Sequence, residues 1–340
     1  MKKALIYFPL WLCLFFGCMP ASEIETRNHP APPSFAPNPA ELPIESSSET
    51  STLKIHLLNV GQGDSTLLQM PNGKTLLIDA GNEGKGIEVV VPFLQSQNIS
   101  KIDAALLTHY DADHMAGMDE VISFYPPDLG IFDRGQNPMD DSPFFSAYTS
   151  AAGTLRKSLQ AGDEIRLDSS VKIRCVISNG QIWQGPLLSL EGPFSQKENA
   201  SSLGILLEYG KFRYLTSGDL TGGGSPGGFQ TLDLETELAH TLGKVSAVHV
   251  NHHGSSTSSN TTFVELTRPL IALFNVGNEN EYGHPAQEVL ERWKSVGSDL
   301  WLTEKGNGGF IAGENIANGH ILLETDGVSM EVNGEGYEIE

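Results

Sequence analysis

The sequence is poor in cysteine and in basic residues, and each shortage excludes a class of protein. Its three cysteines have neither the spacing of a Cys-x-x-Cys zinc site nor that of a disulfide framework. Lysine and arginine total 21 against 42 aspartates and glutamates, which gives a formal net charge of −21. An acidic surface disfavours non-specific binding to phosphate polymers, and no basic run is evident. A role with nucleic acid would therefore require bound metal ions or a local basic patch.

The glycine-rich stretches do not form nucleotide-binding motifs. Residues 221–228 lack the lysine and the following serine or threonine of a phosphate-binding loop. Gly61 and Gly63 have the spacing that begins a dinucleotide fingerprint, but they lie between two apolar strand patterns and do not open a helix. Both stretches are therefore interpreted as turns or surface loops.

The amino-terminal residues have the pattern of an export signal. Lys2 and Lys3 give a basic start, and residues 4–16 form an apolar run too short for a membrane-spanning helix. Gly17 and Cys18 follow, an order that resembles the end of a bacterial lipoprotein signal peptide with Cys18 as the lipidated residue. We therefore expect an exported lipoprotein anchored to an outer membrane or a cell surface. Cleavage of an ordinary signal near Ala21, giving a secreted or periplasmic protein, is the alternative.

The chain is predicted to have three segments. Residues 1–18 are the signal peptide, and residues 19–52, rich in proline, serine and glutamate and without periodicity, are a disordered linker. Residues 53–340 are one folded domain.

Short apolar strands and amphipathic helices alternate through most of the domain. Strands are predicted at residues 54–60, 65–70, 75–79, 104–107, 202–209, 212–216, 245–250 and 270–276, and helices at 87–95, 115–124, 232–242 and 286–296. Residues 126–153 and 179–198 are predicted to be rich in loops, residues 154–177 to form short strands, and residues from 300 onward to form closing strands.

Residues 108–117 contain an unusual density of metal ligands. His109, Asp111, Asp113 and His114 lie within six positions, directly after an apolar run that is predicted to be a buried strand. A strand followed by a tight loop can turn all four side chains toward one point. Mixed imidazole and carboxylate ligands suit zinc, manganese or iron better than calcium or magnesium. The alternative is a solvated polar loop that happens to be rich in these residues.

Polar residues recur where successive apolar strands end. Besides the loop above, Asp79, Asp219, the pair His252 and His253, and His284 all follow predicted strands. Loops that project from one end of a rigid sheet are a common place for a catalytic site. We therefore expect these side chains to line one cleft.

Seven motifs in this order resemble the metallo-β-lactamase fold and, more narrowly, the hydrolase domain of ComEC-type DNA-uptake (competence) proteins. They are residues 59–64, 77–81, 108–114, 199–203, 217–219, 251–255 and 282–285. The resemblance implies an α/β fold of the four-layer αββα sandwich type for residues 53–340. It also implies a hydrolase with two divalent metal ions, zinc or manganese.

The resemblance also implies roles for individual residues. His109 and Asp111 would hold one metal, Asp113 and His114 the other, Asp219 would bridge both, and either His252 or His253, with His252 favoured, would complete a coordination shell. Asp64, Asp79, Asn199, Ser201 and Tyr282 would orient the ligands or contact substrate. Asp113 would also orient the attacking water, and His284 would assist the leaving group, so these two are the candidate catalytic residues.

The sequence departs from the wider family at two positions. Asp111 stands where the superfamily has a second histidine, a substitution that ComEC-type domains share and that favours manganese relative to zinc. Asn59 stands where ComEC-type domains usually have aspartate. Since Asp64 and Asp79 are present, we expect Asn59 to weaken metal affinity only modestly.

A phosphodiester is the substrate that this resemblance suggests, either DNA or a smaller ester. The net charge of −21 does not favour long polyanions, so a small or surface-displayed phosphodiester is equally compatible. Two alternatives remain: a β-lactam or lactone hydrolase of the same fold, and a non-catalytic metal-binding surface lipoprotein. The predicted partners are the substrate and, through Cys18, a membrane; no protein partner is evident.

Overall fold

The computed structural model describes residues 52–138, 142–225 and 230–339 of the 340-residue chain. The predicted signal peptide with Cys18, and nearly all of the predicted linker, lie outside the described residues. Within the described residues, no helix is both long and apolar enough to cross a membrane. The first strand begins at Leu53.

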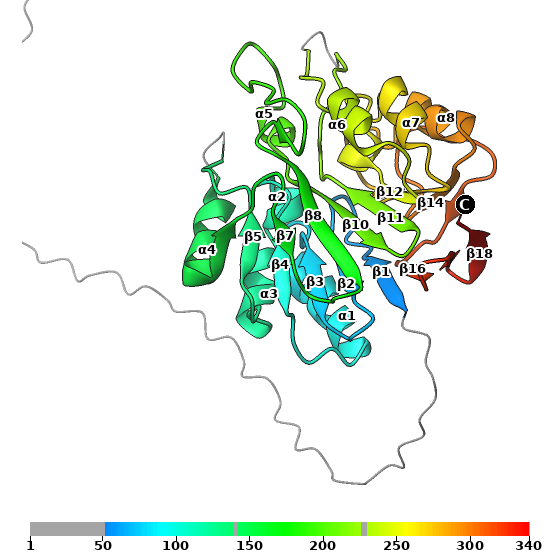
Figure 1. Cartoon of the computed structure of the whole chain (residues 1–340). Coiled ribbons are helices and arrows are strands. Elements are labelled where there is room, and N and C mark those ends of the chain that lie inside the picture. Colours follow the sequence, from blue (N-terminus) through cyan, green and yellow to red (C-terminus); the bar gives the residue numbers. More distant parts are fainter. Residues whose placement is uncertain (1–51, 139–141, 226–229, 340) are drawn as a thin grey trace, which may run out of the picture. The chain divides into compact units, whose positions relative to one another are not determined.

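The strands belong to two mixed sheets (Figure 1). Their bounds are β1 Leu53–Leu57, β2 Thr66–Gln69, β3 Thr75–Ile78, β4 Ala104–Leu106, β5 Ile131–Asp133, β6 Arg156–Ser158, β7 Glu164–Ile165, β8 Val171–Ser178, β9 Gln181–Ile182, β10 Gly204–Tyr209, β11 Phe212–Thr216, β12 Ala247–His249, β13 Ile271–Phe274, β14 Asp299–Leu302, β15 Asn315–Ile316, β16 Ile321–Thr325, β17 Ser329–Val332 and β18 Glu335–Glu338.

Helices alternate with the strands along most of the chain. Their bounds are η1 Gly86–Val90, α1 Val91–Ser96, α2 Ala112–Met115, α3 Met118–Phe124, α4 Pro143–Ala152, η2 Gly153–Leu155, α5 Lys197–Ala200, α6 Glu235–Leu242, η4 Asn251–Gly254, α7 Thr261–Thr267 and α8 Gln287–Ser295.

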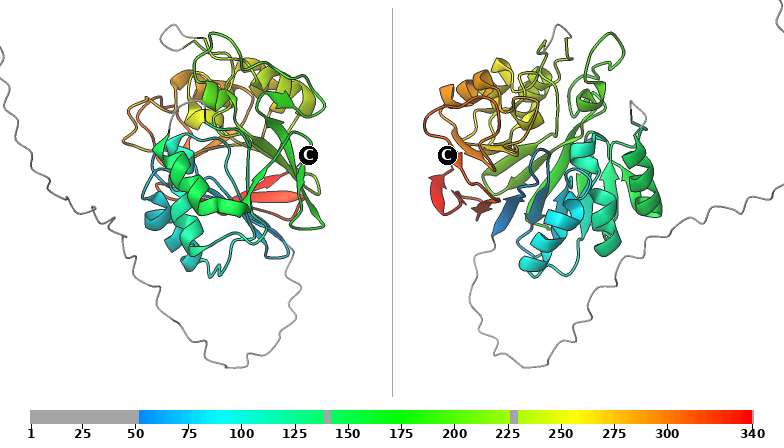
Figure 2. Two further views of the ribbon diagram at one scale, coloured as in Figure 1. Left: turned by 90° about the vertical axis from the view of Figure 1, so that its left-hand side faces the viewer. Right: turned by 180° about the vertical axis from the view of Figure 1, so that it is seen from behind.

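Each sheet has an antiparallel part and a parallel part. The first has the order β18-β17-β16-β1-β2-β3-β4-β5-β6 and is parallel from β3 to β6. The second has the order β15-β14-β13-β12-β11-β10-β8-β7, with β9 also paired to β8, and is parallel from β11 to β15. Helices α1, α3 and α4 cover the outer face of the first sheet, and α6, α7 and α8 cover the outer face of the second (Figures 1 and 2).

Alternate residues of the central strands pack into different cores. Leu76 of β3 and Ile205 of β10 lie in the core between the sheets. Leu77 faces the helices on the first sheet, and Leu206 faces those on the second. Successive side chains of a strand point to opposite faces, and both faces are buried here, so the strands have continuous apolar sequences. Three apolar interfaces thus separate four layers, and the predicted αββα sandwich is confirmed.

Three helical stretches differ from the sequence prediction. Residues 126–153 were expected to be rich in loops, but they contain strand β5 and helix α4. A three-residue strand is too short to show alternation, and α4 is rich in aromatic and hydroxyl side chains of low helix propensity. The helix expected at residues 115–124 begins earlier and breaks at Gly117, where an added Cβ would lie 2.3 Å from the Ala80 carbonyl oxygen. Helix α7 had not been predicted.

Candidate metal centre

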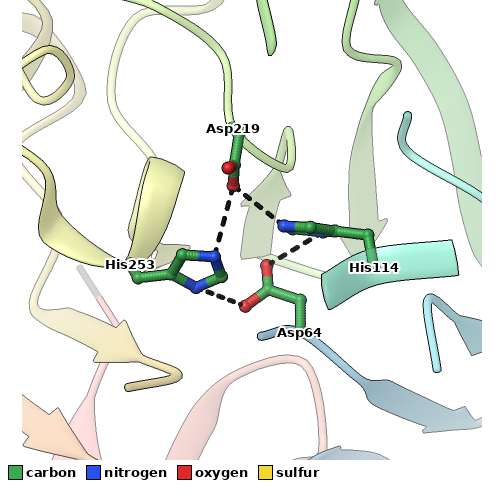
Figure 3. Close-up of side chains that lie close together, drawn as sticks. All are labelled: Asp64, His114, Asp219 and His253. Carbon is green, nitrogen blue, oxygen red and sulfur yellow. Dashed lines mark ion pairs between the residues drawn. The ribbon is translucent and has the colours of Figure 1, made fainter. Parts of the chain in front are cut away.

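The polar residues that follow β1, β3, β4, β11 and β12 meet at one end of the sandwich. Figure 3 shows four of the side chains in this group, drawn from both sheets. Asp64, His114, Asp219 and His253 each offer one ligand atom, and these atoms all lie within 4.8 Å of one another. All four residues are buried. The predicted convergence of strand ends on one site is therefore present in the fold.

Asp219 lies at the centre of the group and faces imidazoles with both carboxylate oxygens. Its Oδ1 is 3.1 Å from His114 Nε2 and 3.7 Å from His253 Nε2. Its Oδ2 is 3.5 Å from His252 Nε2 and 3.9 Å from His109 Nε2. This carboxylate therefore divides four histidines into two pairs and can bridge two cations.

A second aspartate accompanies each pair. Asp113 Oδ2 is 3.3 Å from His253 Nε2, on the Oδ1 side of Asp219. Asp111 Oδ2 is 3.5 Å from His109 Nε2, on the Oδ2 side. Each half of the centre thus offers two imidazole nitrogens, one aspartate of its own and one oxygen of Asp219. Such a set of nitrogen and oxygen donors suits a divalent ion.

Several of these donor atoms are buried without a hydrogen-bond partner among the described residues. They are His109 Nε2, His114 Nε2, His253 Nε2 and Asp219 Oδ1. An unsatisfied buried polar atom is costly, so one such atom calls for an explanation, and four that gather at one carboxylate call for a shared one. The residues present therefore fit a bound divalent metal.

Carboxylates also lie behind two of the imidazoles. Asp79 accepts hydrogen bonds from the backbone nitrogen and the hydroxyl of Thr108, at 2.8 and 2.7 Å, and its Oδ2 is 2.8 Å from His114 Nδ1. Asp64 Oδ1 is 3.1 Å from His253 Nδ1. Both aspartates face Nδ1, whereas the Nε2 atoms of the same rings face Asp219. A carboxylate in this place fixes the direction and tautomer of a ligating ring.

Two glycines allow the loops of the centre to approach one another. Gly63 has a φ of +132°, and an added Cβ there would lie 2.4 Å from the Asp113 carbonyl oxygen. Gly218 has a φ of +53°, and its added Cβ would lie 2.6 Å from Thr108 Oγ1. The second contact joins the ligand loop after β4 to the loop after β11. A larger residue at either position would push the two sides of the centre apart.

His252 and His253 occupy an unusual turn. Both lie in η4 with left-handed backbone angles, φ 53° and 52°, which residues other than glycine rarely adopt. The turn is held by Asn251, which donates to Glu235 Oε1 at 2.7 Å and accepts from Ser217 Oγ at 2.7 Å. Because of this turn the two neighbouring rings reach opposite sides of Asp219.

Glu235 of α6 is fully buried and binds three donors. Besides Asn251, the backbone nitrogens of Ser259 and Asn260 donate to its carboxylate at 2.7 and 2.8 Å. Burial raises the pKa of Glu235 to about 7, although these hydrogen bonds oppose the shift. The residue connects helix α6 to the histidine turn and to the start of α7.

The centre opens into a cavity of about 410 Å³. Its walls are formed by Gln62, Asp111, Asp113, Gln196, Asn199, Asp219, His252, His253, Ser255, Ser256, Tyr282 and His284. The His284 ring lies 5.4 Å from the His252 ring, and burial, followed by the nearby His252, lowers the pKa of His284 to about 3. His284 is therefore a neutral imidazole at the wall of the cavity.

Opposite charges at the centre favour the ionised forms of its carboxylates. Burial by itself would raise the pKa of Asp219, but His252 and His114 lower it well below its usual value. Burial would also lower the pKa of His114, but Asp219 raises it well above the usual value. In the metal-free protein, protons on histidines thus balance the buried carboxylates, and a bound cation would replace them.

The predicted site residues divide into three groups by location. Around the centre itself lie His109, Asp111, Asp113, His114, Asp219, His252 and His253. Behind it or along the cavity lie Asp64, Asp79, Asn199, Tyr282 and His284. The Ser201 hydroxyl instead donates to the Lys197 carbonyl oxygen at 2.7 Å within α5, away from the cavity walls.

The sequence offered a choice between His252 and His253, and the structure places both beside Asp219. Sequence reasoning did not single out Gln62, Gln196 or Glu235. Gln62 lies inside the motif at residues 59–64, so its position two residues before Asp64 was the available indication. Nothing in the sequence around Glu235 distinguishes it from other glutamates on amphipathic helices.

Comparison with known proteins identifies relatives of the chain. Residues 58–274 match the metallo-beta-lactamase superfamily. ComE operon protein 3 of Bacillus subtilis is 26% identical over 258 residues, which cover 70% of this chain and 30% of that protein. Competence protein ComA of Neisseria gonorrhoeae is 26% identical over 251 residues, which cover 72% of this chain and 30% of that protein. These matches confirm the resemblance to competence-type proteins, but the chain spans less than a third of either relative.

A solved structure is also similar. The metallo-beta-lactamase fold protein YhfI from Bacillus subtilis aligns with a TM-score of 0.46 and 11% identity, over 80% of this chain and 100% of that one.

Proposed function

The chain belongs to the metallo-beta-lactamase superfamily, and from that premise we propose that it is a metal-dependent hydrolase of phosphodiester bonds. The observation that carries the proposal is the position of Asp219, whose two oxygens face two separate pairs of imidazoles. Competence-type relatives support a phosphodiester rather than a β-lactam as substrate.

Two sets of residues would hold the ions. His109, Asp111 and His252 would bind one with Oδ2 of Asp219, and Asp113, His114 and His253 would bind the other with Oδ1. When bound, two such ions supply Lewis acidity to a phosphoryl oxygen and make hydroxide available near neutral pH. Asp111 adds an anionic oxygen where the wider superfamily has imidazole, which favours manganese relative to zinc.

The remaining chemistry belongs to side chains at the cavity wall. Asp113 is partly exposed to the cavity, and we assign it the orientation of the attacking water through a hydrogen bond to its carboxylate. His284 lies across the same cavity, and its neutral ring can donate a hydrogen bond to the leaving oxygen. Asp64 and Asp79 keep the ligating rings in place.

Export and lipid anchoring at Cys18 are part of the same proposal. The supporting observation is the order of basic, apolar and Gly-Cys residues at the amino terminus. The enzyme would then act on a phosphodiester at an outer membrane or cell surface, with DNA as one candidate. Growth with radiolabelled palmitate tests the anchor: the full-length chain should be labelled, and Cys18→Ser should not.

The experiment that tests the activity uses the domain without its signal. Manganese and zinc content is measured by mass spectrometry, and turnover is followed on bis-p-nitrophenyl phosphate and on a chromogenic cephalosporin. We expect close to two ions per chain and manganese-dependent phosphodiester cleavage. Asp219→Asn should lose both the ions and turnover, whereas Asp128→Asn, at a surface ion pair with Lys101, should keep both.

Three results would contradict the proposal. Turnover that survives Asp219→Asn would exclude the bridging role. Cleavage of the cephalosporin alone would make the protein a β-lactam hydrolase, and a folded, metal-loaded protein silent on both substrates would make it a binding module.

A further inference from the structure

We propose that the cavity takes one small phosphodiester at a time and that Tyr282 stacks against a planar ring of that ester, an inference that rests on the proposed phosphodiesterase function. An internal bond of a long nucleic acid would then be a poor substrate. Four observations lead to this: the charges of the cavity wall, its unpaired amide groups, the exposure of Tyr282 and the volume of the cavity.

Apart from three histidines at or beside the metal centre, the described residues of the cavity wall carry acidic and neutral side chains. Among the described residues that line it are three aspartates, three amides and two serines, but no lysine or arginine. Arg134 directly follows strand β5 in the sequence. Its side chain is buried and donates two hydrogen bonds to the Glu198 carboxylate through Nη2, at 2.9 and 2.8 Å. It is therefore not free to bind substrate.

This charge distribution does not suit a polyanion. Proteins that hold nucleic acid neutralise several phosphates with lysine and arginine, and most of their non-specific affinity comes from these contacts. Here any phosphate beyond the one at the metal centre would lie beside Asp111 or Asp113 or over neutral groups. One phosphodiester therefore fits the site, and its neighbours in a chain would find no cationic partner there.

Two glutamines offer neutral groups to such an ester. Gln62 accepts a hydrogen bond from the Gly277 nitrogen at 3.3 Å through Oε1, while its Nε2 is buried without a partner among the described residues. Gln196 Oε1 is likewise buried and unpaired within the described part of the chain. Unpaired buried amide atoms in a cavity wall are satisfied when a polar ligand enters. Gln62 Nε2 is a donor and suits an ester oxygen.

Tyr282 provides an aromatic face at the cavity. Its side chain is 72% exposed, and its ring lies nearly parallel to that of His284, with centroids 5.6 Å apart and planes at 20°. Its loop is well organised, because buried Asn280 donates to the carbonyl oxygens of Gly277 and His284 at 2.6 and 2.9 Å. An exposed aromatic ring held in place beside a cavity is a ready surface for stacking a planar group.

The size of the cavity agrees with a small ligand. At about 410 Å³ it lies toward the lower end of the range for small-molecule sites, roughly 300–1,000 Å³. An ester with one aromatic or heterocyclic ring, such as an aryl or nucleoside phosphodiester, matches that volume and the face of Tyr282.

The test compares Tyr282→Leu with wild type on an aryl phosphodiester, bis-p-nitrophenyl phosphate, and on an alkyl one, glycerophosphocholine. The ratio of variant to wild-type kcat/KM is taken for each substrate, so that the different leaving groups cancel. We expect a loss of roughly tenfold on the aryl ester, mainly in KM, and less than about twofold on the alkyl ester. Tyr282→Phe, which keeps the ring, should recover most of the loss.

Phe124→Leu is the matched control, since Phe124 is an exposed aromatic residue of α3 that does not line the cavity. It should leave both ratios near one. Equal losses of Tyr282→Leu on both esters, or no loss on either, would overturn the stacking role. Absence of turnover on every phosphodiester would instead refute the proposed function itself, so the two failures are distinguishable.

A second measurement addresses the size of the substrate without relying on turnover. Binding of a fluorescently labelled oligodeoxynucleotide of about 20 nucleotides is followed by fluorescence anisotropy at low and at high salt concentration. Cleavage of a dinucleotide and cleavage of the same oligomer are measured in parallel. We expect weak binding with a shallow salt dependence, and dinucleotide cleavage at least as efficient as that of the oligomer. Tight binding that falls steeply with salt, together with preference for the oligomer, would overturn the inference.

Discussion

Asp79 shows how one carboxylate can orient a candidate metal ligand from behind. It accepts hydrogen bonds from the backbone and hydroxyl of Thr108 and from His114 Nδ1. These contacts fix both the loop after β4 and the ring of its last histidine. Because the Nε2 atom of that ring faces Asp219, any rotation of His114 would change the geometry of the whole centre.

Asp79→Asn should therefore weaken metal binding more than it weakens the fold. The amide keeps the size of the side chain but replaces one acceptor with a donor, and we expect metal affinity to fall by about 10- to 100-fold. Metal titration calorimetry measures this. Asp103→Asn is the control, since Asp103 is a buried aspartate that accepts from the Thr75 nitrogen at 2.9 Å, away from the centre. Equal affinities for the two variants would contradict this role of Asp79.

The ligands could be predicted from the sequence, but their arrangement could not. His109 and His114 were identifiable because they lie in a dense cluster after a strand pattern. His252 and His253 reach different sides of Asp219 because both have left-handed backbone conformations. No local sequence pattern requires these conformations. Gln62 and Glu235 gain their importance from distant neighbours, so one sequence alone did not reveal them.

At the scale of elements, helix α6 supports the histidine turn η4 through Glu235. The carboxylate binds Asn251 of the turn and the backbone nitrogens at the start of α7. Two consecutive left-handed histidines each cost about 1–3 kcal/mol, so surrounding contacts must hold them in place. Glu235 supplies one such contact, to Asn251, and connects it to the backbone that begins α7.

Glu235→Ala should lower both stability and metal affinity. Three buried donors would lose their acceptor, and we expect the free energy of unfolding to fall by about 3 kcal/mol, measured in urea. Metal affinity should fall as well, because the turn would no longer be held. Glu237→Ala, an exposed position on the same helix, should change neither quantity. A Glu235→Ala variant as stable as Glu237→Ala would show that the turn holds itself.

Elements with long apolar patterns were predicted well, and short ones were not. Strand β11 was predicted with its observed bounds, and α8 within one residue at each end. Strand β5 and helix α4 were missed because their stability comes from packing. Parallel neighbours β4 and β6 hold β5, and Tyr148 of α4 donates to buried Asp133 at 2.8 Å. Such tertiary support leaves little trace in local sequence.

At the scale of the whole domain, two histidines connect stability to pH. His56 and His320 both pack against Phe93, with their ring centroids 5.2 and 4.9 Å from that of Phe93. Burial lowers the pKa of His56 below the usual value of 6.5, and partial burial lowers that of His320, which is more exposed to solvent. His320 Nδ1 accepts from the Asn59 nitrogen at 2.9 Å, so protonation there would also break a hydrogen bond. Lys54 opposes protonation of His56, and Glu324 favours it.

The stabilising contribution of His56 and His320 should be lost in mild acid for this reason. A histidine with a lowered pKa binds fewer protons folded than unfolded, so its contribution is complete above about pH 6.5 and is lost as pH falls below that value. The urea concentration at the midpoint of unfolding is measured at about pH 7.5 and about pH 5. The difference between these two midpoints should be smaller in the double variant His56→Gln, His320→Gln than in wild type. His240→Gln, at an exposed position of α6, is the control. An unchanged pH difference would exclude these two histidines as its source.

The burial of both faces of the central strands has a consequence for how strand register is specified. In a sheet with one wet face, a slip of one residue exposes apolar side chains and is strongly penalised. Here the same slip would exchange one apolar core for another, as between Leu76 and Leu77, so the hydrophobic pattern alone discriminates weakly. Polar strand ends such as Asp79 and Asn275, which donates to the Leu58 carbonyl oxygen at 3.1 Å, must carry that information. The residues that build the candidate metal centre at this end of the sandwich thus also align its strands, and mutations there can misfold the domain as well as disrupt the centre.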